Sequence, residues 1–392
     1  MIEFEEALKI ILSREVFPEA EEVELSCSIN RVLAQDAISD MNMPPFDKSA
    51  VDGYACRRSD LADELKVLEI IPAGQIPQFR INENECSKVM TGAMVPEGAD
   101  CIIMIEDVEV LSSDKIKFTA AKTSDNICYT GEDIRLGDIV LKKGLLIKPQ
   151  HIAVLASVGC SRPKVYRKPK VNIITTGDEL VEPHQKPDAG KIRNSNAWQL
   201  IAQCEAMNVS VDYSGIAPDS KKETLEMIRK ALAGNDVILI TGGVSMGDYD
   251  YVPDVLQEAG FTFHFKSVAM QPGRPTLFAS HKSGKFCFGL PGNPVSSFNQ
   301  FELLVKPLLY KMMGHAYKPV VLQLPLAKDF YRKKSKRLNF IPVLLNSEGE
   351  VLPVEYHGSA HINSLTDAYG LMSIPIGTTE IKKGDIVDVR PV

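Results

Sequence analysis

The sequence predicts a multidomain protein of mixed α/β and β structure, built around a three-layer, doubly wound α/β domain. From Lys170 to Gly314, strand-like segments alternate with helical segments, which is the pattern of a mainly parallel sheet covered by helices on both faces. The segment VILIT (237–241) is apolar or β-branched at every position, as expected for a strand that is buried on both sides. The stretches before and after this region are short strands separated by glycine and proline turns, which favours separate β-rich modules.

Two helical segments frame the first β-rich stretch. FEEALKIILS near the N-terminus is amphipathic, and Pro149 is well placed to begin a second helix. We expect these two helices to pack together, so that the β-rich stretch between them is an insertion. The predicted domains are a helical and extended domain I (1–40 and 142–169), an inserted β-rich domain II (41–141), the α/β domain III (170–316) and a small C-terminal β-barrel domain IV (317–392).

Composition argues against several classes of partner. The net charge is -7, whereas nucleic acids and anionic membranes favour a basic face, so neither is expected as a partner. No apolar run approaches the roughly 18 residues of a membrane span, and the acidic N-terminus is unlike a signal peptide.

The eight cysteines are scattered without a C-x-x-C pair, which favours reduced thiols in a cytoplasmic protein. His357 and His361 have a metal-ligand spacing, but the Gly358 and Ser359 between them favour a loop over a zinc site.

Two glycine-containing loops at the predicted sheet edge are suited to an anion. TGGVSMGDYDY follows strand 237–241, and its glycines allow left-handed backbone and close approach of a ligand. GLPGNPVSSF ends another strand and begins a helix, where hydroxyls and free N–H groups hold oxyanions. The alternative is that both loops merely reverse the chain. Neither loop is a Walker A or G-x-G-x-x-G motif, so the common modes of ATP and NAD binding are not indicated.

Acidic residues follow three strands of the same predicted sheet. Asp178 and Glu179 follow the first strand, Asp219 follows the second, and Asp248 and Asp250 follow the third. Carboxylates beside an anion site would repel the ligand unless a divalent cation lay between them, so we expect Mg²⁺. For Asp219 alone, the alternative is simple capping of the following helix.

Eight motifs, in order along nearly the whole chain, resemble one family. They are KSAVDGYA (48–55), VMTGAMVPEGAD (89–100), GEDIR (131–135), TTGDEL (175–180), TGGVSMGDYDY (241–251), QPGRP (271–275), GLPGNPVS (289–296) and GSAHINSL (358–365). The sequence resembles the molybdopterin molybdenumtransferase (MoeA) family, which is related to the C-terminal part of gephyrin. The resemblance implies an elongated homodimer with an active site shared between the α/β domain of one chain and the β module of the other. It also implies that adenylylated molybdopterin is cleaved with Mg²⁺, molybdate is inserted and AMP leaves.

The resemblance assigns roles to residues of this chain. The implied catalytic residues are Asp52, Asp133, Glu179, Asp219 and Asp250, and Glu179, Asp219 and Asp250 are also the implied metal ligands. The implied substrate-binding residues are Thr91, Asp178, Gly242, Gly243, Ser245, Gly247, Pro291, Gly292, Asn293 and Pro294. The implied molybdate pocket is Arg274, Ser296, Arg337 and Ser359. A guanidinium offers several fixed donors to an oxyanion, although Arg337 alone could also be a solvated surface charge.

The chain departs from the family at positions where lysine is common. Gln271, Arg274 and Ser267 stand at such positions, so molybdate binding would be weaker unless Lys266 or Lys48 substitutes. Two alternative functions are a non-catalytic, gephyrin-like scaffold and the adenylyltransferase step that prepares the substrate. The clustered acids favour an enzyme over a scaffold, and the additional β modules favour the insertion step. The adenylyltransferase and recipient molybdoenzymes are then possible partners.

Overall fold

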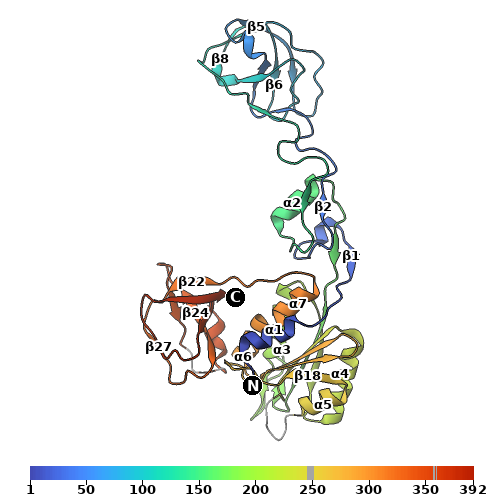
Figure 1. The fold of residues 1–392 in the computed structure, drawn as a ribbon, viewed down its shortest axis with the longest axis vertical. Coiled ribbons are helices and arrows are strands. Elements are labelled where there is room, and N and C mark those ends of the chain that lie inside the picture. The colour runs from blue at the N-terminus through green and yellow to red at the C-terminus, as the bar shows by residue number, and fades with distance from the viewer. Residues whose placement is uncertain (245–250, 356–357, 359) are drawn as a thin grey trace.

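The computed structural model describes residues 1–244, 251–355, 358 and 360–392 of the chain. The molecule is elongated: an arm carries a β-rich module at one end, and an α/β domain and a C-terminal sheet lie at the other (Figure 1). Three six-stranded sheets account for most of its strands. The chain therefore has the multidomain, mixed α/β and β fold that the sequence predicts.

The central sheet of the α/β domain has the order β16-β13-β17-β21-β20-β18. Its first four strands are parallel, whereas β20 runs antiparallel to both neighbours. Because β16 and β17 lie on opposite sides of β13, the strand order reverses at β13 and β17, the position where such sheets bind ligands. The strands are β13 (Lys170–Thr176), β16 (Ser210–Ala217), β17 (Val237–Thr241), β18 (Phe261–Phe265), β20 (Leu277–His281) and β21 (Phe286–Leu290).

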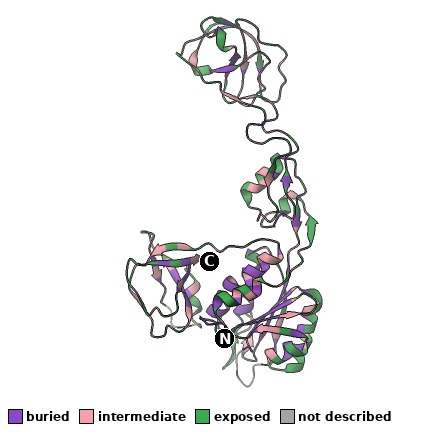
Figure 2. Cartoon of the chain, in the orientation of Figure 1, coloured by how far each residue is buried: buried purple, intermediate pink, exposed green. Residues whose placement is uncertain are grey.

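Helices cover both faces of this sheet, and the strands between them are buried (Figure 2). Alternate residues of β17 explain this: Leu239 belongs to the core under α3 and α7, and Ile238 to the core under α4 and α5. Ser220 caps α4 by accepting the N–H of Glu223, and Pro294 begins α6 at a position that needs no N–H. The helices are α3 (Asn196–Ala206), α4 (Lys221–Gly234), α5 (Val252–Glu258), α6 (Pro294–Gln300), the π-helical turn η4 (Phe301–Val305) and α7 (Lys306–Met312).

The N-terminal helix α1 (Phe4–Leu12) packs differently from our expectation. Phe4 and Ile11 are buried in the α/β core, and α1 contacts η4 and α7. Helix α2 (Pro149–Ser157) lies in the arm, against the short turn η1 (Leu25–Cys27). The predicted pairing of α1 with the helix after Pro149 is therefore wrong: the apolar face of α1 covers part of the larger core beside the sheet.

The arm consists of two antiparallel chain segments that leave the α/β domain and return to it. Strand β1 (Ala20–Glu22) pairs with β12 (Lys164–Tyr166), and β2 (Ala37–Ile38) pairs with β11 (Ile139–Leu141). The module at its end is a sheet of order β7-β4-β6-β5-β9-β8, beside a short pair formed by β3 and β10. These strands are β3 (Lys48–Ser49), β4 (Gly53–Cys56), β5 (Glu64–Ile71), β6 (Glu85–Val89), β7 (Cys101–Met104), β8 (Val108–Ser112), β9 (Lys115–Phe118) and β10 (Ile127–Cys128).

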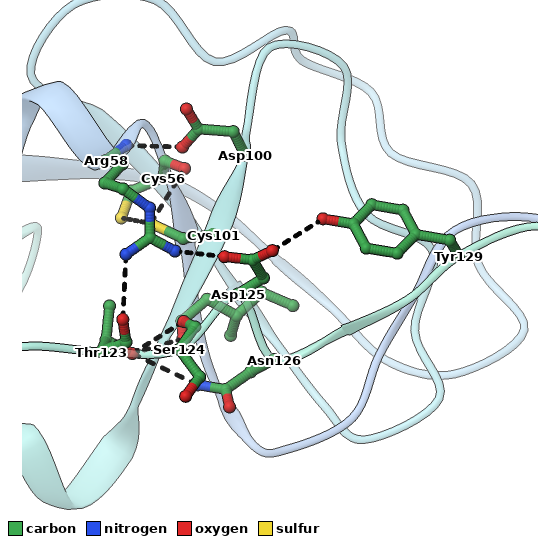
Figure 3. Close-up of polar contacts among 10 residues, drawn as sticks. Cys56, Arg58, Asp100, Cys101, Thr123, Ser124, Asp125, Asn126 and Tyr129 are labelled. Carbon is green, nitrogen blue, oxygen red and sulfur yellow. Dashed lines mark hydrogen bonds and ion pairs between the residues drawn. The ribbon is translucent and has the colours of Figure 1, made fainter.

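Arg58 ties the last segment of the arm module to its sheet (Figure 3). Its guanidinium donates to the Asp125 carboxylate at 2.5 Å and to the Thr123 carbonyl at 2.9 Å. Its backbone N–H donates to Asp100 at 2.6 Å, and Tyr129 donates its hydroxyl to Asp125 at 3.1 Å. These contacts fix the segment that leads directly to the GEDIR motif.

The C-terminal sheet is curled, and the small β-barrel that the sequence predicts for this domain stays a prediction. Its strands follow the order β19-β24-β26-β28-β22, with β25 also paired to β24. The curl brings Leu326, just after β22, into a bridge with Val351 of β25. The strands are β19 (Met270–Gln271), β22 (Leu322–Pro325), β24 (Leu338–Leu345), β25 (Val351–Pro353), β26 (Gly370–Ile374) and β28 (Ile386–Pro391), and a separate pair is formed by β23 (Phe330–Tyr331) and β27 (Glu380–Ile381).

All eight cysteines are free thiols, as the sequence predicts. Among the helices of the described residues, none is both long enough and apolar enough to span a bilayer.

Candidate functional site

A cleft of about 490 Å³ opens at the carboxyl edge of the α/β sheet. It is lined by residues that follow four neighbouring parallel strands, which is where ligands bind in open α/β sheets. Both sequence-predicted loops contribute to it. The lining residues are Thr176, Gly177, Glu179, Ile192, Asp219, Gly242, Gly243, Val244, Pro275, Pro291, Gly292 and Asn293.

Gly242 and Gly243 are required by the geometry of the first loop. Their φ angles are 92° and 61°, in the region that favours glycine. A Cβ on Gly242 would lie 2.5 Å from the Thr176 carbonyl oxygen, and one on Gly243 would lie 2.9 Å from the Thr176 hydroxyl. The chain therefore passes directly over the end of β13, and at these two positions no side chain lies between its backbone and the cleft.

The two loops are held against each other by Asn196 of α3. Its side-chain amide donates to the Thr241 hydroxyl at 3.0 Å and to the Gly292 carbonyl at 2.7 Å. The Thr241 hydroxyl in turn donates to the Pro291 carbonyl at 3.1 Å. A Cβ on Gly292 would lie 3.8 Å from the Cα of Gly242, so the two loops lie side by side. Asn196 thus fixes the relative position of the two glycine loops.

Sequence reasoning missed this clamp. Asn194 plays a related part, because its amide donates to the Thr175 hydroxyl at 3.0 Å and to the Tyr213 hydroxyl at 2.9 Å. The available signal was the run RNSN at the start of a helix, where two asparagines are more than a single cap requires.

Two of the predicted acids, Glu179 and Asp219, line the cleft. Asp178 lies beside them and accepts the backbone N–H of Asp219 at 3.1 Å. The capping alternative for Asp219 does not hold, because Ser220 occupies the N-cap position of α4. Four further residues of the sequence hypothesis lie outside the described part of the chain: Ser245, Gly247, Asp248 and Asp250.

The described residues contain no group of three acids, histidines or cysteines arranged to hold a metal ion. Glu179 and Asp219 nevertheless supply two carboxylates to one cleft. Mg²⁺ is commonly held by one or two carboxylates together with substrate phosphates and water. The donor set therefore suits a magnesium ion that arrives with a phosphorylated substrate better than a preformed protein cage.

The predicted residues of the arm lie far from this cleft within one chain. Asp52 precedes β4 and accepts both the backbone N–H of Thr91, at 2.6 Å, and its hydroxyl, at 2.8 Å. The backbone hydrogen bond is the main cause of a lowered pKa at Asp52, and the hydroxyl adds to it. Asp133 is exposed near the base of the same module, with its N–H bound to the Met43 carbonyl. The arm module and the α/β domain lie at opposite ends of the molecule (Figure 1).

Three of the predicted molybdate residues, Arg274, Ser296 and Arg337, lie along the seam between the α/β domain and the C-terminal sheet. Pairing of β19 with β24 places Arg337 beside Met270, whose carbonyl accepts its guanidinium at 3.4 Å. Arg274 is exposed on the loop that follows β19, and Ser296 is buried in α6. Ser359 lies outside the described residues. Helix α6 contacts η5 (Ile362–Leu365).

Buried amides of α6 hold this seam in place. The Gln300 amide donates to the carbonyls of Pro272 and Gly273 at 3.4 and 3.3 Å, and Asn299 donates to the Phe340 carbonyl at 3.3 Å. Gly273 has a φ of 105°, and a Cβ there would lie 2.0 Å from the Gln300 amide nitrogen. The QPGRP loop is therefore shaped by Gln300, and Arg274 projects from it into solvent.

A second cleft of about 540 Å³ lies on the C-terminal sheet beside these residues and includes Gln271, Asn339 and Gly358 in its lining. Neither lysine that we considered as a substitute is placed at this cleft. Lys266 lies over the Phe263 ring, 4.4 Å from its centroid, and Lys48 belongs to β3 of the arm.

Fold and cleft together define a multidomain protein whose α/β domain has a ligand cleft at the carboxyl edge of its sheet. Residues 172–311 match a family described as "Probable molybdopterin binding domain". Residues 2–159 match the MoeA N-terminal region (domain I and II), and residues 323–392 match the MoeA C-terminal region (domain IV).

Relatives that match nearly the full length of the chain identify its family. The chain is 35% identical to a molybdopterin molybdenumtransferase of Staphylococcus epidermidis, over 99% of this chain and 95% of that protein. It is 34% identical to the protein of that name from Staphylococcus aureus, with the same coverage. A solved molybdopterin biosynthesis MoeA protein from Pyrococcus horikoshii superposes with a TM-score of 0.85, at 31% identity and 100% coverage of both chains. The chain belongs to the MoeA family.

Proposed function

We propose that this protein inserts molybdenum into molybdopterin during molybdenum cofactor biosynthesis. In the proposed reaction the phosphoanhydride of adenylylated molybdopterin is cleaved, molybdate is transferred to the dithiolene and AMP is released. The observation that carries the proposal is the cleft at the sheet edge, where two glycine loops and two carboxylates meet. The full-length relatives named molybdopterin molybdenumtransferase support the same activity.

The loops would bind the phosphates of the substrate. Gly243 and Gly292 leave backbone amides within reach of a ligand, and Asn293 lies at the N-cap of α6. Gly242 allows close approach of the ligand, although its own N–H donates to the Leu290 carbonyl at 3.2 Å. We assign Pro291 and Pro294 to the shape of this second loop, since Pro294 sets the first turn of α6. Ser245 and Gly247 remain assigned to the substrate on sequence grounds alone.

Glu179 and Asp219 would hold Mg²⁺ together with the substrate phosphates, with Asp250 as a third proposed ligand. The ion would neutralise charge as the anhydride breaks. Asp178 would keep the loop before α4 in place, because it binds the backbone of Asp219. Molybdate would lie at the seam near Arg274 and Arg337, with the hydroxyls of Ser296 and Ser359.

The arm residues Asp52, Thr91 and Asp133 would complete the site of a second chain. We propose a homodimer in which the arm of one protomer reaches the cleft of the other, because within one chain these residues lie at the far end of the molecule (Figure 1). Free cysteines are consistent with the proposed cytoplasmic location. The adenylyltransferase that makes the substrate and the enzymes that receive the product are proposed as transient partners.

A non-catalytic scaffold is the main alternative. Two carboxylates lining one cleft repel each other, and a protein that only bound partners would gain nothing from them. The adenylyltransferase step is the other alternative, but the arm and the C-terminal sheet favour the insertion step.

The direct test is incubation with adenylylated molybdopterin, Mg²⁺ and molybdate, followed by measurement of AMP and metallated cofactor. Asp219→Asn, in the cleft, and Asp52→Asn, in the arm, are each expected to abolish AMP release. Asp254→Asn is the matched control, because this exposed acid of the same domain pairs with Lys221, and it lies outside the cleft lining. Full AMP release by Asp219→Asn would remove the cleft from the mechanism.

Mixing the two inactive variants tests the shared site. In a random mixture half of the dimers are mixed, and each mixed dimer has one intact site, so about a quarter of wild-type activity should return. If mixing restores nothing while each variant remains folded and dimeric, the site is not shared between chains.

A further inference from the structure

A separate cavity of about 300 Å³ lies where the α/β domain meets the last strand of the C-terminal sheet. Its wall includes Lys306 and Tyr310 of α7, Tyr317 and Lys318 of the connecting segment, and Arg390 of β28. It shares no lining residue with the substrate cleft.

Arg390 brings a positive charge to this cavity, where Glu5 and Asp388 attract it only from a distance. Its guanidinium carbon lies 5.5 Å from the ring centroid of Phe4 and 5.6 Å from that of Phe340. Within the described part of the chain Arg390 forms no ion pair, and burial is the main cause that lowers its pKa. Arg390 is half-buried, and aromatic faces compensate a partly desolvated guanidinium only in part, so an anion beside it would be favoured.

Two tyrosine hydroxyls at the same cavity are also without partners. The rings of Tyr310 and Tyr317 are stacked, with centroids 4.7 Å apart and planes 12° apart. Both side chains are half-buried, and neither hydroxyl has a hydrogen-bond partner among the residues that the structure describes. Burial is the main cause that raises the pKa of each phenol, so both are neutral donors at ordinary pH. Neither hydroxyl is among the buried polar atoms that lack a partner, so both remain accessible and can donate to a ligand.

The one carboxylate side chain in the wall is already engaged. Glu302 binds the ammonium of Lys306 at 2.6 Å through one oxygen and the Gln203 amide at 2.8 Å through the other. It therefore balances Lys306, and it does not form a salt bridge with Arg390. Lys318, which is exposed at the rim, adds further positive charge.

We propose that this cavity binds a small dianion carrying phosphate or carboxylate groups, with Arg390 as the charged anchor and the hydroxyls of Tyr310 and Tyr317 as donors. Because these residues come from α7, from the connecting segment and from β28, the bound anion joins the α/β domain to the C-terminal sheet. The ligand thereby stabilises the seam between these two domains. This site does not depend on the function proposed above.

Isothermal titration of the full-length protein with inorganic phosphate and with succinate tests the proposal, against potassium chloride at equal ionic strength. Arg390→Met keeps an apolar stem over the two rings, and it should weaken binding by about tenfold or more. Tyr317→Phe removes one hydroxyl and should weaken binding about threefold or more. Tyr331→Phe is the matched control, since its hydroxyl binds Asp329 on a different surface, and it should bind like wild type.

The substrate cleft could also bind phosphate, so the two sites must be separated. Asn293→Asp places a negative charge in the substrate cleft and keeps a residue that suits an N-cap. The event lost in Arg390→Met should persist in Asn293→Asp. Binding of phosphate, of succinate or of both at this site supports the proposal. Binding of phosphate alone identifies a phosphate ligand, and binding of succinate alone identifies a carboxylate ligand. Unchanged affinity in both Arg390→Met and Tyr317→Phe overturns it, as does binding of neither probe beyond chloride. Should Arg390→Met fail to fold, Tyr317→Phe decides alone.

Discussion

Asn196→Ala separates the positioning of the glycine loops from the stability of the fold. The substitution removes an amide that donates at 3.0 Å to Thr241 and at 2.7 Å to Gly292. Each hydrogen bond contributes about 1 kcal/mol to stability. The same side chain also buries an amide oxygen that has no partner, and its removal relieves a cost of about 1–3 kcal/mol. The two effects nearly cancel, so the free energy of unfolding should change by about 1 kcal/mol or less.

The expected effect on activity is much larger. Without the clamp, the Gly292 carbonyl loses its bond to α3, and the Pro291–Asn293 loop is held to the end of β17 only through the Thr241 hydroxyl at Pro291 and the Gly242 N–H at Leu290. A displacement of about 1 Å at a reacting group can cost a hundredfold in rate. We therefore expect kcat/KM for AMP release from adenylylated molybdopterin to fall ten- to a hundredfold. Urea unfolding of the same preparation measures the stability.

Asn172→Ala is the control for this experiment. Asn172 is a buried amide of the same sheet, and its oxygen accepts the Ser214 hydroxyl at 3.1 Å in the first half of β13, away from the carboxyl edge. It should lose a comparable amount of stability and keep full activity. The reasoning fails if Asn196→Ala retains wild-type kcat/KM, or if Asn172→Ala loses as much activity.

Three further predictions concern single residues. Gly243→Ala should destabilise the fold by about 1–2 kcal/mol through its φ of 61°, and further because the new Cβ would contact the Thr176 hydroxyl. Its thermal transition should therefore fall below that of Gly190→Ala, where no atom lies within 4 Å of the new Cβ. Equal transition temperatures would exclude the contact with Thr176. Thr91→Val should raise the pKa of Asp52 toward its ordinary value, which NMR titration can follow. Because the pKa of Asp52 is lowered in the folded state, its contact with Thr91 stabilises the fold above the ordinary pKa, and this stabilisation is lost as pH falls through the lowered value. An unchanged pKa would show that the Thr91 hydroxyl contributes nothing. Arg337→Ala should raise the molybdate concentration needed for insertion by about tenfold, and an unchanged requirement would place molybdate elsewhere.

Local pattern predicted the α/β domain well. The apolar segment 237–241 is β17, with the same bounds, and Ser220 caps α4 as the spacing of Ser220 and Glu223 indicates. Alternation of strands and helices also predicted that the two glycine loops lie at one sheet edge. These features depend on residues close together in the chain, so the sequence is sufficient to place them.

Packing over long separations could not be predicted in the same way. The amphipathic face of α1 fits any apolar surface, and only the size of the core beside η4 and α7 decides where it packs. The clamp by Asn196 was missed for a related reason: its partners are 45 and 96 positions away, and an asparagine before a helix is usually a cap.

The chain alone determined the order of its strands and helices, the two glycine loops and the acids that follow the strands, because each rests on the conformational and chemical preferences of neighbouring residues. Only the tertiary structure decided which of these acids share a cleft and that the arm carries Asp52 and Thr91 away from it. It also decided that Tyr310, Tyr317 and Arg390 line one cavity between the α/β domain and the C-terminal sheet. Those outcomes depend on how distant surfaces fit together, and local sequence does not specify that fit.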